Sequence, residues 1–221
     1  MKRVSLLSIL LMLSLSLATT AQQTPIDLSA FANTGWCTAP SPYFLNCTTF
    51  PFGTHKYNGV TFNIAGTSNT TNNAWVASTA AGGGSGQVSI TIPVNVPNVR
   101  TVYTLMNTYW GSTATGLLTV TFAGTNGASW TYNPISLVEI RDYNQDGYTN
   151  SIACRLPGGP QKAATINAWN NNEGQRLDMQ TFELPVSFKG QTLTSITITD
   201  NGDENVQRVI LAAITVSTNA P

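Results

Sequence analysis

The stretch Val88-Ser-Ile-Thr-Ile-Pro-Val-Asn-Val96 alternates between apolar and polar residues along its whole length. Because successive side chains of a β-strand point to opposite faces of a sheet, this pattern predicts a strand with one buried and one solvated face. Pro93 has no amide hydrogen to donate, so it places the strand at a sheet edge or at a bulge. The apolar face of such a strand needs a second layer to cover it, which favours two packed sheets.

Similar segments recur along the chain between clusters of Gly, Pro and Asn, and helical periodicity is nearly absent. Residues 102–110 are apolar on both faces and predict a central strand, while residues 209–216 predict a deeply buried one. Hairpin turns are expected at Asn58-Gly59 and between Gly124 and Gly127. The other expected strands are residues 26–31, 57–64, 117–122, 130–132, 135–140, 179–184 and 193–199. About nine short strands with regular turns predict an all-β fold, an antiparallel β-sandwich or jelly roll.

The N-terminal residues have the pattern of a secretory signal peptide. Lys2 and Arg3 precede the apolar residues 4–17, and the small residues of Ala18-Thr-Thr-Ala21 follow. The apolar run is shorter than the ~20 residues that a membrane-spanning helix needs. We therefore expect residues 1–21 to be cleaved and residues 22–221 to form a single secreted, extracellular domain. The periplasm and the cell surface are alternative destinations.

The composition argues against partners that carry charge. Removal of Lys2 and Arg3 leaves eight Lys and Arg against ten Asp and Glu, and charged residues are only 9% of the whole chain. Without a basic surface the protein is a poor candidate for nucleic-acid binding. A surface of hydroxyls and amides suits neutral ligands such as sugars, although it also serves solubility alone.

Three cysteines remain after the predicted cleavage: Cys37, Cys47 and Cys154. In an oxidising compartment Cys37 and Cys47 could close a short loop as a disulfide. Cys154 is then left over, and burial, a different pairing or a link to another chain are all open. One histidine and three scattered cysteines do not make a tetrahedral zinc site.

The order of segments resembles the galactose-binding-domain-like sandwiches. The resemblance rests on the hairpin at residues 58–62, the strand 88–96, the hairpin 117–132, the strand ending in Glu139-Ile-Arg-Asp142, and the closing strands 195–198 and 210–216. It covers most of residues 22–221 and implies a jelly roll that binds sugars through loops at one end. It also implies a structural calcium ion and a module that is more often non-catalytic than enzymatic.

Two acidic loops could bind calcium, which prefers oxygen ligands. The first has oxygen-bearing residues at alternate positions: Asp142, Asn144, Asp146 and Tyr148. Ala153 stands where the bidentate glutamate of an EF-hand would be, so the site would need further ligands. The second loop offers Asp203 and Glu204. Ordinary Asx turns explain both loops equally well, because Asp, Asn and Gly favour tight turns without any metal.

Aromatic side chains in expected loops are the second functional signal, because a flat ring can stack on a sugar. We predict a carbohydrate site formed by Trp110, Trp169, Tyr109, Asn170 and Trp75. For Trp75 the alternative is an anchor that fixes its loop to the domain. Trp36, Tyr43, Tyr143 and Tyr148 are weaker candidates, and Trp130 is expected in the core.

A catalytic role has little support in the residues. His55 lacks a nucleophile motif, which disfavours a Ser-His-Asp triad. Two facing carboxylates would suffice for a glycoside-processing enzyme, and the available residues are Glu139, Asp142, Glu173, Asp178, Glu183, Asp203 and Glu204. We therefore expect a carbohydrate-binding module. The alternatives are an adhesion or protein-interaction domain and, third, such an enzyme.

Overall fold

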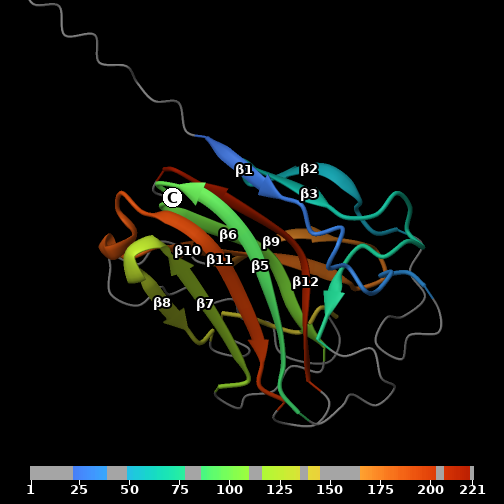
Figure 1. Ribbon diagram of the computed structural model, residues 1–221. Coiled ribbons are helices and arrows are strands. Elements are labelled where there is room, and N and C mark those ends of the chain that lie inside the picture. The colour runs from blue at the N-terminus through green and yellow to red at the C-terminus, as the bar shows by residue number, and fades with distance from the viewer. Residues whose placement is uncertain are drawn as a thin grey trace, which may run out of the picture.

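Two antiparallel sheets packed face to face form the body of the protein (Figure 1). The computed structural model describes residues 22–38, 49–77, 86–109, 116–134, 139–144, 165–202 and 207–219. The six-stranded sheet contains β1 (Gln23–Ile26), β4 (Trp75–Val76), β6 (Thr101–Tyr109), β9 (Thr165–Asn170), β10 (Arg176–Glu183) and β12 (Arg208–Ser217). The four-stranded sheet contains β5 (Val88–Pro97), β7 (Leu118–Gly124), β8 (Ser129–Tyr132) and β11 (Thr192–Asp200). A separate hairpin consists of β2 (Gly53–Tyr57) and β3 (Val60–Ile64), and two 3₁₀ turns are η1 (Thr125–Gly127) and η2 (Val186–Phe188).

The strand order is that of a jelly roll. The first sheet runs β1-β12-β6-β10-β9, with β4 beside β12, and the second runs β5-β11-β7-β8. When β1, β5, β6, β7, β8, β10, β11 and β12 are counted as first to eighth, the orders are 1-8-3-6 and 2-7-4-5. Two interlocking Greek keys of this kind define the jelly roll. The expected all-β antiparallel sandwich is therefore confirmed.

The predicted strand environments are confirmed by position and burial. β5 lies at the edge of its sheet, and its register shifts close to Pro93. β6 lies between β12 and β10, and every residue of β12 is buried. Residues from the facing sheets fill the space between them: Ile90, Ile92, Val120, Phe122, Ile196 and Ile198 from one sheet, and Val102, Met106, Phe182, Leu211, Ile214 and Val216 from the other.

The outer face of the six-stranded sheet carries a second core. Strands β6, β10 and β12 are buried on both faces, so the outer face of this sheet is covered as well as the inner one. The hairpin β2–β3 lies over this outer face beside β1 and β12 (Figure 1). Val60, Phe62 and Ile64 pack there against Tyr103 and Leu105. The turn at Asn58-Gly59 is confirmed, and the hairpin forms a layer that covers the outer face of the six-stranded sheet.

Other elements differ from the predictions in their bounds. The first strand is β1, Gln23–Ile26, and not residues 26–31. It ends there because the Ser29 amide donates to Asp27 Oδ1 (2.8 Å), and the Phe31 amide donates to the Leu28 carbonyl (2.9 Å), which forms turns. Strand β9 was not predicted at all. Most of the expected strand 135–140 lies outside the described residues.

In the described part of the chain, no helix is long and apolar enough to cross a membrane. The proposed signal peptide, residues 1–21, lies outside the described residues. Its cleavage and the single-domain assignment of residues 22–221 therefore stay predictions.

Replacing Gly202 with alanine is expected to destabilise the fold more than replacing Gly190. Both have a left-handed backbone, with φ of +74° and +76°, which costs a Cβ-bearing residue about 1–2 kcal/mol. A Cβ on Gly202 would also meet the Gly86 carbonyl oxygen at 2.3 Å, whereas a Cβ on Gly190 would have no neighbour within 4 Å. We expect the Gly202→Ala variant to lose about 1–3 kcal/mol more, as in overpacked cores. Urea unfolding of the two variants measures this difference, and equal losses would contradict the close contact.

Candidate functional site

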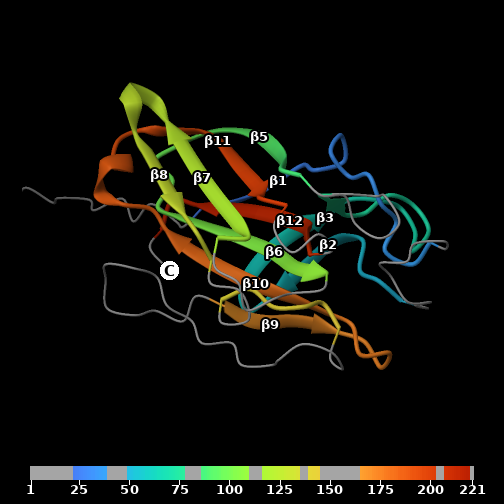
Figure 2. The same ribbon diagram turned by 90° about the horizontal axis from the view of Figure 1, so that it is seen from below.

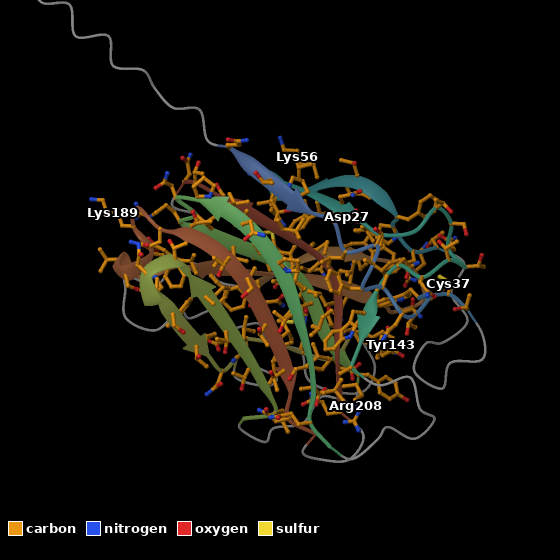
Figure 3. All side chains as sticks on the ribbon, viewed as in Figure 1. Asp27, Cys37, Lys56, Tyr143, Lys189 and Arg208 are labelled. Carbon is orange, nitrogen blue, oxygen red and sulfur yellow. The ribbon has the colours of Figure 1, made fainter. Side chains whose placement is uncertain are left out.

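Three strands place their ends together at one end of the sandwich, which we call the Arg208 end. β12 begins at Arg208 opposite Tyr109, the last residue of β6. Asp200 ends β11, and its Oδ2 accepts the amide hydrogen of Val209 (2.8 Å). This bond joins the two sheets. Figure 3 labels Arg208 and Tyr143 toward this end and Lys189 far from it.

Residues 139–144 run beside β6 and β10 at the Arg208 end. The Thr108 amide donates to the Arg141 carbonyl (2.9 Å), and the Tyr143 amide donates to the Thr108 carbonyl (2.9 Å). On the other side the Arg176 amide donates to the Tyr143 carbonyl (2.8 Å). The segment is therefore held by main-chain bonds to two strands, and it brings Asp142 and Asn144 close to the start of β10.

A buried ion pair also fixes this segment. Arg141 Nε and Nη2 donate to Asp178 Oδ2 and Oδ1 at 2.7 and 2.8 Å. Asn107 Nδ2 donates to the same Oδ2 (2.9 Å), and Asn107 Oδ1 accepts the Asp178 amide hydrogen (2.9 Å). Asp178 is fully buried and Arg141 is 8% exposed. In such surroundings a bidentate pair needs its extra hydrogen bonds to offset the lost hydration.

Five rings form a continuous chain at the Arg208 end, which we call the aromatic cluster: Trp36, Phe50, Tyr109, Tyr143 and Trp169. Trp36 is its centre, stacked on Phe50 (ring centroids 4.4 Å apart) and edge-on to Tyr143 (5.6 Å). Tyr109 stacks on Tyr143 (5.9 Å), and Phe50 meets Trp169 edge-on (5.5 Å). Trp36, Phe50 and Tyr143 are buried, whereas Tyr109 and Trp169 are half-buried. The two accessible rings are thus the ends of a packed row.

Amide side chains border the cluster at the turn between β9 and β10. Asn171 Oδ1 accepts the amide hydrogens of Glu173 (3.0 Å) and Gln175 (2.9 Å). Asn171 Nδ2 donates to the side chains of the same two residues, at 3.1 Å in each case. Trp36 Nε1 donates to Gln175 Oε1 (3.0 Å), which ties the turn to the aromatic cluster. Asn170, at the end of β9, is exposed beside this turn.

The structure brings together three of the five predicted ligand-binding residues. Tyr109, Trp169 and Asn170 lie at the Arg208 end, although Trp169 and Asn170 belong to edge strand β9 and not to a loop (Figure 2). Trp110 lies outside the described residues, directly after Tyr109. The prediction that Trp75 binds the ligand is corrected. Trp75 is 7% exposed in the core between the sheets, so it anchors its segment and is not available to a ligand.

The predicted metal ligands are described only in part. Asp142 is buried, and its Oδ1 accepts the Asn144 amide hydrogen (2.8 Å), which is an Asx turn. Asp146, Tyr148, Asp203 and Glu204 lie outside the described residues. Within the described ranges no three acidic, histidine or cysteine side chains are grouped as metal ligands. Asn144 and Gly202, the last described residues before these segments, are both near the Arg208 end.

Several candidate catalytic carboxylates already have structural partners. Glu139 Oε2 accepts a hydrogen bond of 2.5 Å from the Tyr132 hydroxyl. Burial raises the pKa of Tyr132 well above its ordinary value, and the bond to Glu139 raises it further. Asp178 is bound by Arg141, and Glu173 by Asn171. These bonds give each of the three carboxylates a structural role.

Two further predictions concern His55 and the cysteines. His55 Nε2 is 2.9 Å from the Phe52 carbonyl oxygen, within the covering hairpin. Cys37 is disulfide-bonded, but Cys47 and Cys154 lie outside the described residues, so the pairing of Cys37 with Cys47 stays a prediction.

Phe50, Asn171 and Gln175 are parts of the site that the sequence reasoning missed. Phe50 follows directly after the cysteine loop, and nothing local marks it as a partner of Trp36. Asn171 and Gln175 lie in an amide-rich stretch whose composition indicated a loop.

Comparison of the chain with family models and with curated proteins finds no match.

Proposed function

We propose that the protein is a secreted carbohydrate-binding module of the galactose-binding-like type. Its ligand would be a neutral glycan bound at the Arg208 end. The observation that carries the proposal is the aromatic cluster: Tyr109 and Trp169 are half-buried rings held in place by buried rings behind them. A rigid ring with remaining accessible surface can stack on a sugar at little entropic cost.

Amide groups beside the rings support the same ligand class. Asn170 is exposed next to Trp169, and Asn144 is half-buried after Tyr143. Such groups can hydrogen-bond sugar hydroxyls while the rings cover the apolar C–H face. Calcium bound by Asp142 and Asn144, with ligands from Asp146, Tyr148, Asp203 or Glu204, is part of the proposal and would stiffen these loops. For a protein-interaction domain a contiguous apolar surface would be expected. In the described ranges the exposed large apolar residues are Phe52 and Val186.

Binding of residues 22–221 to a glycan array, first with calcium and then with EDTA, tests the proposal. We expect retention on one class of neutral glycan, lost by at least about tenfold, or ~1.4 kcal/mol, in the Trp169→Ala variant. The matched control is Trp130→Ala, because Trp130 is also half-buried but packs against Phe122 in the other sheet (5.2 Å). Circular dichroism would show that both variants are folded.

The outcomes separate the ligand from the metal. Binding that EDTA removes supports calcium at the Asp142 loop. Binding that survives EDTA supports the sugar proposal but excludes a metal that is required for binding. A blank array in both conditions would reject the sugar proposal and favour a protein partner. Equal binding by the Trp169→Ala and Trp130→Ala variants would reject this location.

A further inference from the structure

We infer that Asn58 is a modification site, at which the protein deamidates spontaneously with water as the co-reactant. The chain contains three Asn-Gly pairs, at Asn58, Asn126 and Asn201. Glycine after asparagine leaves the attacking main-chain nitrogen least hindered, because it has no side chain. The three pairs share this chemistry, but they differ in what holds the asparagine side chain.

The Asn58 side chain is open to reaction. Asn58 and Gly59 have φ of 50° and 84°, which is the left-handed pair of a two-residue hairpin turn between β2 and β3. Asn58 is exposed, and its side chain makes no hydrogen bond to any described residue. A Cβ placed on Gly59 would have no neighbour within 4 Å. The Asn58 carboxamide is therefore unobstructed. Gln23 Nε2 donates to the Gly59 carbonyl oxygen (3.2 Å) and not to the attacking nitrogen.

The carboxamides of Asn126 and Asn201 are held by neighbours. Asn126 Nδ2 donates to Gln191 Oε1 (2.9 Å). Asn201 Nδ2 donates to the Gly116 carbonyl and to Thr119 Oγ1, and its Oδ1 accepts from Gln87 Nε2 (3.2 Å). At Asn201 the attacking main-chain nitrogen is held as well.

The nitrogen that would attack Asn201 is that of Gly202. Its amide hydrogen already donates to Asp200 Oδ1 (2.9 Å). To react, Asn126 or Asn201 must first break hydrogen bonds that Asn58 does not make.

The reaction balances without any oxidant or reductant. The Gly59 nitrogen gives its proton to solvent base and forms a bond to Asn58 Cγ. Solvent returns a proton to Nδ2, the Cγ–Nδ2 bond breaks, and ammonia leaves. Water opens the resulting cyclic imide at either carbonyl, which leaves an aspartyl or an isoaspartyl residue at position 58.

The isoaspartyl product would disturb the covering hairpin. It adds one main-chain carbon to a turn that joins β2 to β3 through two residues only. Hairpin register depends on turn length. The first contacts to be lost would be those in the second core made by the residues directly after this turn, Val60, Phe62 and Ile64.

Peptide mapping of the whole chain after incubation at mildly alkaline pH tests the inference. We expect Asn58 to convert roughly tenfold faster than Asn126 and Asn201, because hydrogen bonds retain the latter two side chains. A Gln191→Ala variant should speed conversion at Asn126 and leave the rate at Asn58 unchanged. Unfolding in urea should bring the three rates together. Equal rates in the folded protein, or faster conversion at Asn126 or Asn201, would overturn the inference.

Discussion

Replacing Asp178 with alanine is expected to lower the free energy of unfolding by about 3–5 kcal/mol, since removing one partner of a buried ion pair is strongly destabilising. Arg141 would lose two acceptor atoms, the Asp178 carboxylate oxygens at 2.7 and 2.8 Å. Asn107 would lose the acceptor of its Nδ2 as well. A loss of this size is a large share of the stability of a typical domain. Denaturant titration of the variant and of the native protein measures it.

Removing both charges provides the control for this prediction. In an Arg141→Met, Asp178→Leu variant no charge is buried alone, so we expect a smaller loss than in Asp178→Ala. An Asp178→Asn variant, which keeps one oxygen acceptor, covers the case in which Asp178→Ala does not fold. If the doubly substituted protein were as unstable as Asp178→Ala, the charge that Asp178→Ala leaves on Arg141 would not be the cause. Double-mutant analysis would then assign the loss to Asn107 and the main chain.

Strand periodicity predicted most of the jelly roll because the buried faces follow the period of two. β5, β6 and β12 each carry enough alternating or continuous apolar residues to be recognised without their neighbours. β9 does not: Thr165-Ile-Asn-Ala-Trp-Asn170 is rich in polar residues, and its strand form depends on pairing with β10. The hairpin β2–β3 shows the other limit. Its pattern says which face is buried but not which sheet buries it.

The candidate site was predictable by residue type but not by geometry. Tyr109 and Trp169 were selected because aromatic rings beside glycine or amides suit a sugar. They are joined through Trp36 and Tyr143, which lie far apart in the sequence but have ring centroids 5.6 Å apart in the structure. Trp75 failed as a ligand residue for the same reason. Its polar surroundings indicated a surface loop, whereas pairing with Leu211 of β12 draws it into the core.

The buried ion pair could not have been predicted from the sequence. Arg141 directly follows Ile140, and Asp178 stands between Leu177 and Met179. Opposite charges separated by a long intervening segment give no sign of contact. Asp142 was the residue singled out there, as a metal ligand. The structure shows that its neighbour Arg141 fixes the segment, so any cation site at Asp142 would be built on this ion pair.

Replacing Trp36 with alanine is the second large effect that we expect, again about 3–5 kcal/mol, because the change leaves a cavity where a fully buried tryptophan packs. The cavity would open between Phe50 and Tyr143, and the bond from Trp36 Nε1 to Gln175 Oε1 would be lost. A Trp36→Phe variant keeps most of the ring and removes this bond. We expect it to lose less stability, about 1 kcal/mol for the bond and a further amount for the smaller ring.

The same two variants test whether the aromatic cluster supports the proposed glycan site. If Tyr109 and Trp169 depend on the buried rings for their positions, Trp36→Ala should weaken glycan retention even under conditions in which the protein is fully folded. Trp36→Phe should retain most of it, because the ring contacts to Phe50 and Tyr143 persist. Trp130→Ala should lower stability without affecting retention, since Trp130 packs in the other sheet. A Trp36→Ala variant that is less stable but binds glycan normally would show that Tyr109 and Trp169 are positioned by their own strands and not by the cluster.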